Sequence, residues 1–443
     1  MATSKNSRSA VRYWALFLLL IAYILSFIDR NIMAILVDPI REDFHISDFG
    51  YGLLNGVAFT FFYAFLGLPI GYLADRRSRT RIIGVGTAVW SVMTFTCGMA
   101  SGFVGLFAAR VGVGVGEAAL SPPAHSLLSD YFSKRQLPVV MAIFTLGIPV
   151  GIGVSFSLGG YIYGYFDAMG GAVLPFLGDL KPWQLTFMMV GAPGLLLAGL
   201  IYMLKEPART GVMETRTELG VNAALAFFKQ HKRVYFFVFA AISALSIVGY
   251  SLMMWYVAHM SRVYDLPAFE ISKTFGLIYL FFGSLGTLGG AWLSGFLGRK
   301  GYKDAGIRVL LIVAVLWVVP GILAPQMPTL TSAFIMAAPC TFFLNAFFGV
   351  SIAAVQVVTP NQLRAQASAV LLLMANIAGL AIGPAIVGLL SDDVFTGVQS
   401  LGNALSLVAA VFSPLAIVLV IFALKPYRQL LEASEQWSLT NDD

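Results

Sequence analysis

Long hydrophobic stretches recur along the whole chain and are separated by polar segments. Each stretch is long enough to cross the hydrocarbon core of a bilayer as an α-helix, which takes about 20 residues. The pattern therefore predicts an all-α membrane protein with twelve transmembrane helices. The predicted spans are 12–37, 51–74, 82–101, 103–127, 139–163, 183–204, 234–260, 270–297, 305–325, 329–352, 362–390 and 399–424.

The composition agrees with this interpretation. Of the 443 residues, 58% are hydrophobic and 11% are charged, whereas about a quarter of an ordinary soluble domain is charged. A soluble enzyme is thereby excluded, and so is a disordered chain, which needs low hydrophobicity and high charge. The two cysteines, Cys97 and Cys340, lie inside apolar stretches, so we expect neither a disulfide framework nor a metal site. No cofactor is expected either.

The longest polar segment, residues 205–233, separates the sixth span from the seventh. Within it, Leu219, Ala223 and Phe227 are spaced as one stripe of a helix, which predicts a helix lying on the membrane surface. The predicted organisation is an N-terminal six-helix bundle over 1–204, the linker with its interfacial helix over 205–233, a C-terminal six-helix bundle over 234–424 and a tail over 425–443.

Basic residues are distributed unevenly between the loops. If the N-terminus and every second loop are placed on one side, the other side holds only Arg41, Lys181, Arg262 and Lys273. Because an excess of Lys and Arg marks the cytoplasmic side, we predict a multi-pass protein of the cell inner membrane with both termini in the cytoplasm. The sequence pI of about 9.2 then reflects topology and not nucleic-acid binding. The basic loops would also hold anionic lipid headgroups.

The loop between the second and third spans reads GYLADRRSRTR over residues 71–81. Gly71 allows two helix ends to approach closely, Asp75 supplies an acceptor, and the following arginines can pair with a neighbouring helix end, where Asp130 is the expected partner. A loop that is merely positive inside would explain the arginines but not the glycine and aspartate before them. The predicted gating cluster consists of Gly71, Asp75, Arg76, Arg79 and Asp130.

Four charged residues lie deep inside predicted spans, more than five residues from either end: Asp29 and Arg30 in the first, Arg110 and Glu117 in the fourth. Each would cost about 2.5–3.5 kcal/mol if left unpaired in the membrane, so they must pair, face water, or both. Arg110 and Glu117 are seven residues apart and share one helix face, about 10 Å apart along the axis. Gly114 lies between them on that face and leaves room for another group.

Asp29 and Arg30 point about 100° apart and cannot both face the same partner. The antiparallel directions of the first and fourth helices bring Asp29 within reach of Arg110, and Arg30 or Arg110 within reach of Glu117. A static network of ion pairs without a transport role is the alternative. We interpret Asp29 and Glu117 as proton-coupling acids, since an internal acid that can be discharged is what proton coupling requires.

The candidate substrate-binding residues are the two internal arginines and nearby or cavity-lining side chains. Arg30 shares a helix stripe with Tyr23 and Phe27, and residues on second-half helices complete the set, although most residues of that kind simply pack against their neighbours. The full set is Arg30, Arg110, Tyr23, Phe27, Trp255, Tyr256 and Asn345. No phosphate-binding loop, zinc spacing or nucleophile motif is present, so we expect no enzymatic activity.

The segment 71–81 resembles the G-x-L-A-D-R-x-G-R-K signature of the major facilitator superfamily, with Ser78 in place of a glycine. Residues 290–300 resemble a decayed second copy, and the glycine-proline pattern over 147–160 resembles the motif of the fifth helix. The resemblance implies two six-helix bundles related by a pseudo-two-fold axis along the membrane normal, around a central cavity.

Residues 27–132 resemble one branch of that superfamily more narrowly, the spinster family. The resemblance is carried by FIDR at 27–30, GLL at 52–54, RVGVGVGEA at 110–118 and SPPAHSLLSDYF at 121–132. It implies alternating-access export of sphingoid or lysophospholipid-like lipids.

Three functions remain open from the sequence. The first is a secondary transporter of an amphipathic lipid or lipophilic organic anion, coupled to protons. The second is a transporter of a small polar anion such as a sugar acid or carboxylate, which the internal arginines suit equally well. The third is a non-transporting membrane sensor, which would need a larger appended domain. The aromatic content favours the first, and we expect a monomer whose other partners are protons and membrane lipids.

Overall fold

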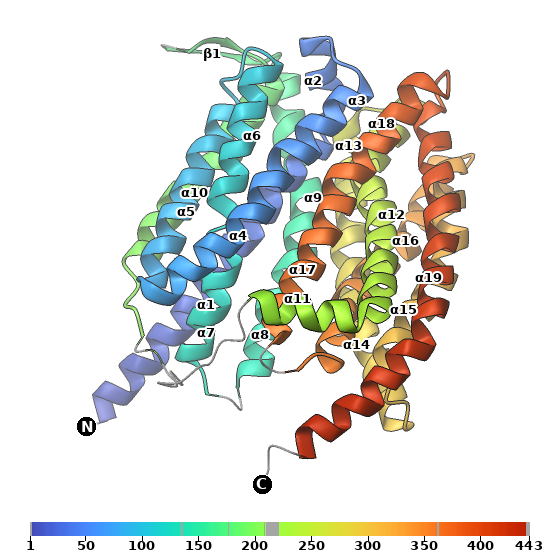
Figure 1. The fold of residues 1–443 in the computed structure, drawn as a ribbon. Helices are drawn as coiled ribbons and strands as arrows, with labels where there is room; N and C mark the ends of the chain where they lie inside the picture. The colour runs from blue at the N-terminus through green and yellow to red at the C-terminus, as the bar shows by residue number, and fades with distance from the viewer. Residues whose placement is uncertain are drawn as a thin grey trace. The chain divides into compact units, whose positions relative to one another are not determined.

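The computed structural model describes residues 2–133, 136–175, 177–207, 209, 221–360 and 363–439, and helices make up nearly all of them (Figure 1). Eleven helical stretches among these residues are long and apolar enough to cross a membrane. The remaining predicted span is α5 (Arg79–Cys97), which begins with two arginines and is therefore less hydrophobic. The predicted all-α fold with twelve transmembrane helices is confirmed.

The chain divides into two compact units, each described separately below. Unit 1 comprises residues 1–212 and 265–280. Its helices are α1 (Ala2–Asn31), α2 (Val37–Phe44), α3 (Asp48–Gly52), α4 (Ala58–Arg76), α5, α6 (Phe103–Glu117), α7 (Ser121–Tyr131), α8 (Leu137–Thr145), α9 (Gly147–Ala168), α10 (Pro182–Tyr202) and α13 (Ala268–Ile278). A small antiparallel hairpin of β1 (Ala172–Leu174) and β2 (Gly178–Leu180) follows α9, with Ala172 opposite Leu180.

Helix α5 lies between α6 and α10 in unit 1, while α1 packs against α9 and α4 against α6 (Figure 1). Unit 2 comprises residues 213–264 and 281–443. Its helices are α11 (Val221–Gln230), α12 (Lys232–Tyr264), α14 (Ser284–Arg299), α15 (Ala305–Leu323), α16 (Leu330–Val357), α17 (Arg364–Asn376), α18 (Gly383–Asp393) and α19 (Ser400–Leu439). Helix α11 lies inside the predicted linker, whereas Leu219 lies outside the described residues.

Several predicted spans are interrupted helices. The fourth consists of α6, which ends at Glu117, and α7, which begins at Ser121 with two prolines in its first turn. A proline disfavours helical geometry in the residue before it and supplies no N–H group, so the backbone breaks ahead of Pro122. Glu117 is therefore the last residue of a helix inside the membrane span. The fifth span breaks in the same way, between α8 and α9.

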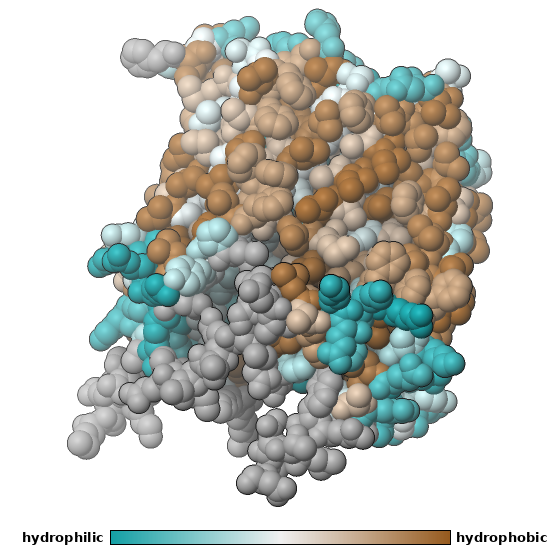
Figure 2. All heavy atoms as spheres, viewed as in Figure 1, coloured by the Kyte–Doolittle hydropathy of each residue, from teal (hydrophilic) through white to brown (hydrophobic). Residues whose placement is uncertain are grey.

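The surface of the membrane-spanning helices is apolar. In Figure 2, hydrophobic side chains cover the middle of the helices and hydrophilic ones gather at their ends. Large side chains such as Leu196, Phe236 and Trp292 are exposed by 78%, 63% and 63%. Such exposure is unfavourable in water but natural where lipid chains surround the helices.

Glycines bring α5 and α6 into close contact. A Cβ added at Gly86 would lie 2.4 Å from the Cβ of Ala119 and 2.8 Å from the carbonyl oxygen of Gly116. A Cβ added at Gly116 would lie 2.5 Å from the backbone nitrogen of Trp90. The two backbones thus touch beside Glu117, and this contact fixes the position of that carboxylate.

We expect Gly86→Ala to lower the apparent Tm of the purified protein, because overpacking of this kind costs about 1–3 kcal/mol. Gly67→Ala is the matched control, since an added Cβ there meets nothing within 4 Å. Helix propensity alone would favour alanine at both positions by about 1 kcal/mol. Equal rises in Tm for both variants would contradict the contact between α5 and α6.

Candidate substrate and coupling site

Two of the four buried charges form an ion pair in unit 1. Nη2 of Arg30 donates to Oε2 of Glu117 at 2.5 Å, and the side chains are 11% and 1% exposed. Arg30 lies one residue before the end of α1, and Glu117 is the last residue of α6. The pair therefore joins two helix ends, in agreement with the expected reach of Arg30 to Glu117.

Aromatic rings surround the guanidinium group of Arg30. Its central carbon lies 4.8, 4.6 and 4.8 Å from the ring centroids of Phe27, Phe59 and Tyr63. Each cation–π contact contributes about 0.5–2 kcal/mol, depending on desolvation. Tyr23 stacks on Phe144 with ring centroids 4.5 Å apart and meets Phe27 edge to face. The arginine charge thus has support other than Glu117.

The other two charges meet differently from the prediction. Arg110 is fully buried, and its Nη1 donates to the main-chain carbonyl oxygen of Asp29 at 3.2 Å. The Asp29 carboxylate instead accepts a hydrogen bond from the Thr94 hydroxyl at 3.3 Å. Arg110 thus lies within reach of Asp29, as expected, but it contacts the main chain, because the carboxylate of Asp29 points toward Thr94 on α5.

Several atoms of this cluster remain without partners. Within the part of the chain that the structure describes, Oδ1 of Asp29, Oε1 of Glu117, and Nε and Nη2 of Arg110 are buried and make no hydrogen bond. A buried polar atom left in this way costs about 1–3 kcal/mol. The space beside Gly114 holds Phe59, whose carbonyl oxygen would lie 2.5 Å from an added Cβ. The room expected beside Gly114 is thus occupied by the backbone of α4, while the cluster keeps polar atoms that a further partner could satisfy.

The candidate residues of unit 2 have structural partners. Trp255 is fully buried and donates to the carbonyl oxygen of Pro384 at 3.0 Å. Tyr256 donates to the carbonyl oxygens of Ala324 and Ala333 at 3.1 and 2.9 Å. Asn345, 8% exposed, donates back to its own helix. In the structure these three side chains therefore make structural contacts within unit 2, which agrees with the alternative that such residues simply pack against their neighbours.

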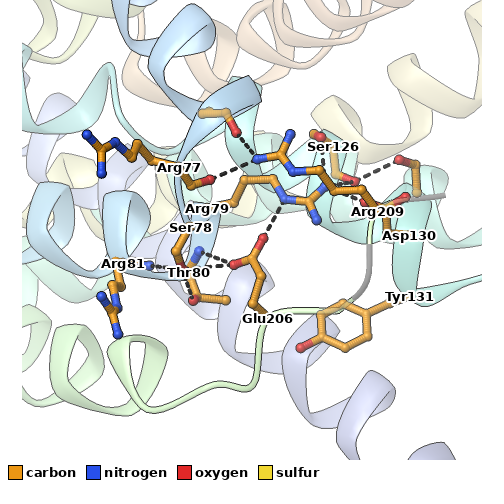
Figure 3. A network of polar contacts seen from close by, with 12 residues as sticks. Arg77, Ser78, Arg79, Thr80, Arg81, Ser126, Asp130, Tyr131, Glu206 and Arg209 are labelled. Carbon is orange, nitrogen blue, oxygen red and sulfur yellow. Dashed lines mark hydrogen bonds and ion pairs between the residues drawn. The ribbon is translucent and has the colours of Figure 1, made fainter. Parts of the chain in front are cut away.

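A second charged cluster lies at the start of α5 (Figure 3). Arg79, 1% exposed, donates from Nη1 to Oδ2 of Asp130 at 2.5 Å and from Nε to Oε1 of Glu206 at 2.7 Å. Its Nη1 also donates to the carbonyl oxygen of Ser126 at 3.1 Å. Glu206 accepts a further bond from the backbone N–H of Thr80 at 3.0 Å. We name Arg79, Asp130 and Glu206 the Arg79 cluster; it connects α5, α7 and the segment after α10.

Of the other members of the predicted gate, the structure describes the surroundings of Arg76 and Gly71. The guanidinium of Arg76 is exposed and lies 4.1 Å from the ring centroid of Tyr72, so Arg76 is not part of the Arg79 cluster. The Asp75 side chain lies outside the described residues. A Cβ added at Gly71 would lie 4.0 Å from the Cβ of Pro122, which is an ordinary contact between α4 and α7.

The sequence did not predict Glu206 as a member of the gating cluster, because its low hydropathy places it in the linker, outside the membrane spans. A comparable acid in unit 2, Asp304, was missed for the same reason. It accepts from Nε of Arg308 at 2.6 Å and from Nε of Arg428 at 2.6 Å, which ties α15 to α19. A sequence feature that could have identified both Glu206 and Asp304 is an acidic residue directly beside a helix end in an otherwise basic loop.

The Arg79 cluster predicts a pH effect on stability. Burial opposes the Glu206 charge, but hydrogen bonds from Thr80, Arg79 and Ser78 outweigh it and lower the pKa of this carboxyl below 4.5. Because the folded pKa is the lower one, the stabilisation is present above pH 4.5 and is lost as the pH falls through the folded pKa.

Glu206→Gln is therefore expected to lower the Tm at pH 7, with a loss of about 1 kcal/mol after allowance for solvent screening. The difference from the parent protein should shrink as the pH falls below 4.5 and through the lowered folded pKa of Glu206, because the glutamate itself then becomes neutral. Glu432→Gln, which neutralises an exposed glutamate on α19, serves as the control. A difference in Tm that is independent of pH would contradict the charged hydrogen bonds.

A bundle of membrane-crossing helices with paired charges buried inside it is typical of a polytopic membrane transporter, because ionisable residues inside membrane spans are rare and usually mark a substrate or ion pathway. The family profile of the Major Facilitator Superfamily matches residues 19–307. The chain belongs to this superfamily: it is a secondary transporter and not an enzyme, and it is similar to the spinster proteins.

Two bacterial relatives match the chain over nearly their whole length. It is 28% identical to an MFS-type efflux pump of Mycolicibacterium smegmatis, over 91% of both chains. It is 25% identical to the hexuronate transporter of Bacillus subtilis, over 90% of this chain and 92% of the relative. Protein spinster homolog 1 of Xenopus tropicalis is 28% identical, over 84% and 72%.

The structure is similar to that of a bacterial homologue of the human lysosomal transporter spinster, solved in an inward-facing, unoccupied conformation. The TM-score is 0.74, at 26% sequence identity, over 96% of this chain and 97% of the other.

Proposed function

We propose that the protein moves an amphipathic lipid or a lipophilic organic anion across the inner membrane by alternating access, coupled to protons. The substrate class is a sphingoid or lysophospholipid-like lipid, or another lipophilic organic anion. The observation that carries this proposal is the Arg30–Glu117 ion pair inside a group of aromatic rings. One arginine, one acid that can neutralise it, and apolar walls together suit a ligand with a charged head and an apolar body.

In this mechanism the proton and the substrate head compete for Arg30. Protonation of Glu117 removes its negative charge and releases the guanidinium, which then binds the anionic head. The rings of Phe27, Phe59 and Tyr63 hold the guanidinium in place during the exchange and face the apolar part of the substrate. Deprotonation restores the ion pair and expels the head, so proton and ligand bias the same two-state equilibrium.

Asp29 is the second proposed proton-coupling acid. Its carboxylate oxygen Oδ1 is buried without a partner, and Arg110, the second proposed substrate-binding arginine, contacts its main chain. A proton on Asp29 would change the charge felt by Arg110 without breaking a direct ion pair. This favours a supporting role for Asp29 and the principal coupling role for Glu117.

We propose the Arg79 cluster as the gate. Its bonds are intact in one conformation and broken in another, because charges at helix ends can separate when helices move relative to each other. Gly71 and Asp75 remain proposed members at the end of α4, and Arg76 is left out because of its position over Tyr72. The bonds from Nη2 of Arg209 to the carbonyl oxygens of Ala74 and Arg77, at 2.7 and 2.8 Å, support the same region.

The second candidate function is transport of a small polar anion. The similarity to a hexuronate transporter favours it, and a buried arginine would bind a carboxylate equally well. The two candidates differ in the walls of the site. A sugar acid needs many hydrogen-bonding side chains, whereas the residues around Arg30 are aromatic.

The deciding experiment is uptake by reconstituted protein. Labelled lysophospholipid, sphingoid and sugar-acid substrates are added outside proteoliposomes, with and without a pH gradient. Gradient-dependent transport of a lysolipid or sphingoid, but not of sugar acids, supports the first function, and the opposite selectivity supports the second. Transport at the same rate with and without the pH gradient would contradict proton coupling. We also propose that the protein is a monomer and that both of its termini lie in the cytoplasm. Labelling of a cysteine in the linker, residues 205–233, from outside the cell would refute this topology.

A further inference from the structure

A groove of about 300 Å³ lies in unit 2, between the start of α12 and the C-terminal part of α19. Its floor is apolar, since Val234 and Leu430 are 4% and 3% exposed. Its walls carry the exposed side chains of Lys232, Arg233 and Gln429. The groove is separate from the buried ion pairs of unit 1, and the mechanism above does not use it.

The groove is basic, and its two cationic side chains, Lys232 and Arg233, can bind an anion. Among the described residues, Lys232 and Arg233 have no acidic partner, and no acidic side chain lines the groove. The neighbouring Arg428 is different because its guanidinium is bound to Asp304 at 2.6 Å. An ammonium and a guanidinium that line the same groove favour a phosphate group, which a guanidinium can bind through two parallel hydrogen bonds.

Lipid-facing residues continue directly from the groove on the same two helices. Phe236 and Phe422 are exposed by 63% and 60%, and Ile421 by 52%. The ring of Phe422 stacks on that of Phe237, with centroids 5.7 Å apart, so α12 and α19 are in contact at this level. Phe236 lies about one helical turn from Arg233, which is about 5 Å along the axis. A basic groove thus opens onto an apolar surface.

We propose that this groove binds the phosphate headgroup of an anionic phospholipid, with its acyl chains along the surface of Phe236 and Phe422. Free phosphate shares the headgroup chemistry but has no use for the apolar surface, and that surface favours the lipid. In the proposed topology the start of α12 faces the cytoplasm, so the lipid belongs to the inner leaflet. Bound there, it links the segment that leads from α11 into α12 to the tail of α19.

The test uses the purified full-length protein in a non-ionic detergent, with lipid binding measured by native mass spectrometry. Phosphatidylglycerol is expected to bind, phosphatidylcholine to bind at least tenfold more weakly, and glycerol 3-phosphate not to compete at millimolar concentration. The double variant Lys232→Gln/Arg233→Gln should weaken phosphatidylglycerol binding about 30-fold, the ratio that corresponds to about 1 kcal/mol per basic residue at a membrane surface.

The matched control is Lys229→Gln/Lys425→Gln, which removes the same charge from exposed positions on α11 and α19 that do not line the groove. It should keep binding within about threefold, and both double variants should keep the lipid-free Tm of the parent protein. Equal losses in the two double variants would show diffuse attraction and overturn the site. Competition by glycerol 3-phosphate, or equal binding of phosphatidylcholine, would overturn the lipid assignment.

Discussion

Glu117→Gln is expected to abolish accumulation driven by a pH gradient, by at least tenfold in proteoliposomes, while exchange of substrate across the membrane continues. Glutamine has nearly the same shape and can still accept a hydrogen bond from Nη2 of Arg30, which now contacts Oε2 at 2.5 Å. The contact between the ends of α1 and α6 is therefore retained. What is lost is the negative charge that a proton can remove, and with it the competition between proton and substrate for the arginine.

Two further variants separate coupling from binding. Arg110→Ala should lose both accumulation and exchange, because a buried charge near Asp29 and Glu117 disappears and both acids lose its influence. Asp29→Asn should reduce accumulation less than Glu117→Gln does. If Glu117→Gln still accumulates substrate in proportion to the pH gradient, Glu117 is not the coupling acid, and Asp29 takes its place in the proposal.

The positions of the buried charges could be predicted from the sequence, but their contacts only in part. Helix geometry places Arg110 and Glu117 on one face and brings Arg30 to Glu117, as the structure shows. Helix geometry does not specify the rotamer of a side chain. For that reason the carboxylate of Asp29 turns to Thr94, and Arg110 reaches the main chain instead.

Contacts between helices were the least predictable part of the site. Phe59 and Tyr63 belong to α4, and nothing in the spacing of α1 indicates that α4 would cover Arg30. Glu206 lies just beyond α10 and looked like an ordinary linker charge, although it completes the Arg79 cluster. Periodicity describes one helix at a time, whereas both sites are made where separate helices meet.

Arg79→Leu is expected to be strongly destabilising, by about 3–5 kcal/mol, the usual cost of removing one partner of a buried ion pair. Asp130 would lose its cation in a position where its side chain is only 7% exposed. The change should appear as a large fall in the Tm of the purified protein. Arg81→Leu is the matched control, because Arg81 is exposed and lies on the same first turn of α5.

The double variant Arg79→Leu/Asp130→Leu separates a structural role from gating. Replacement of both partners removes the uncompensated charge, so most of the Tm should return. If the cluster were purely structural, transport would return as well. If it is a gate, the conformation that it stabilises stays less populated, and the stable double variant remains slow in transport. Normal transport together with a recovered Tm would therefore reject the gate while leaving the ion pair as a support of the fold.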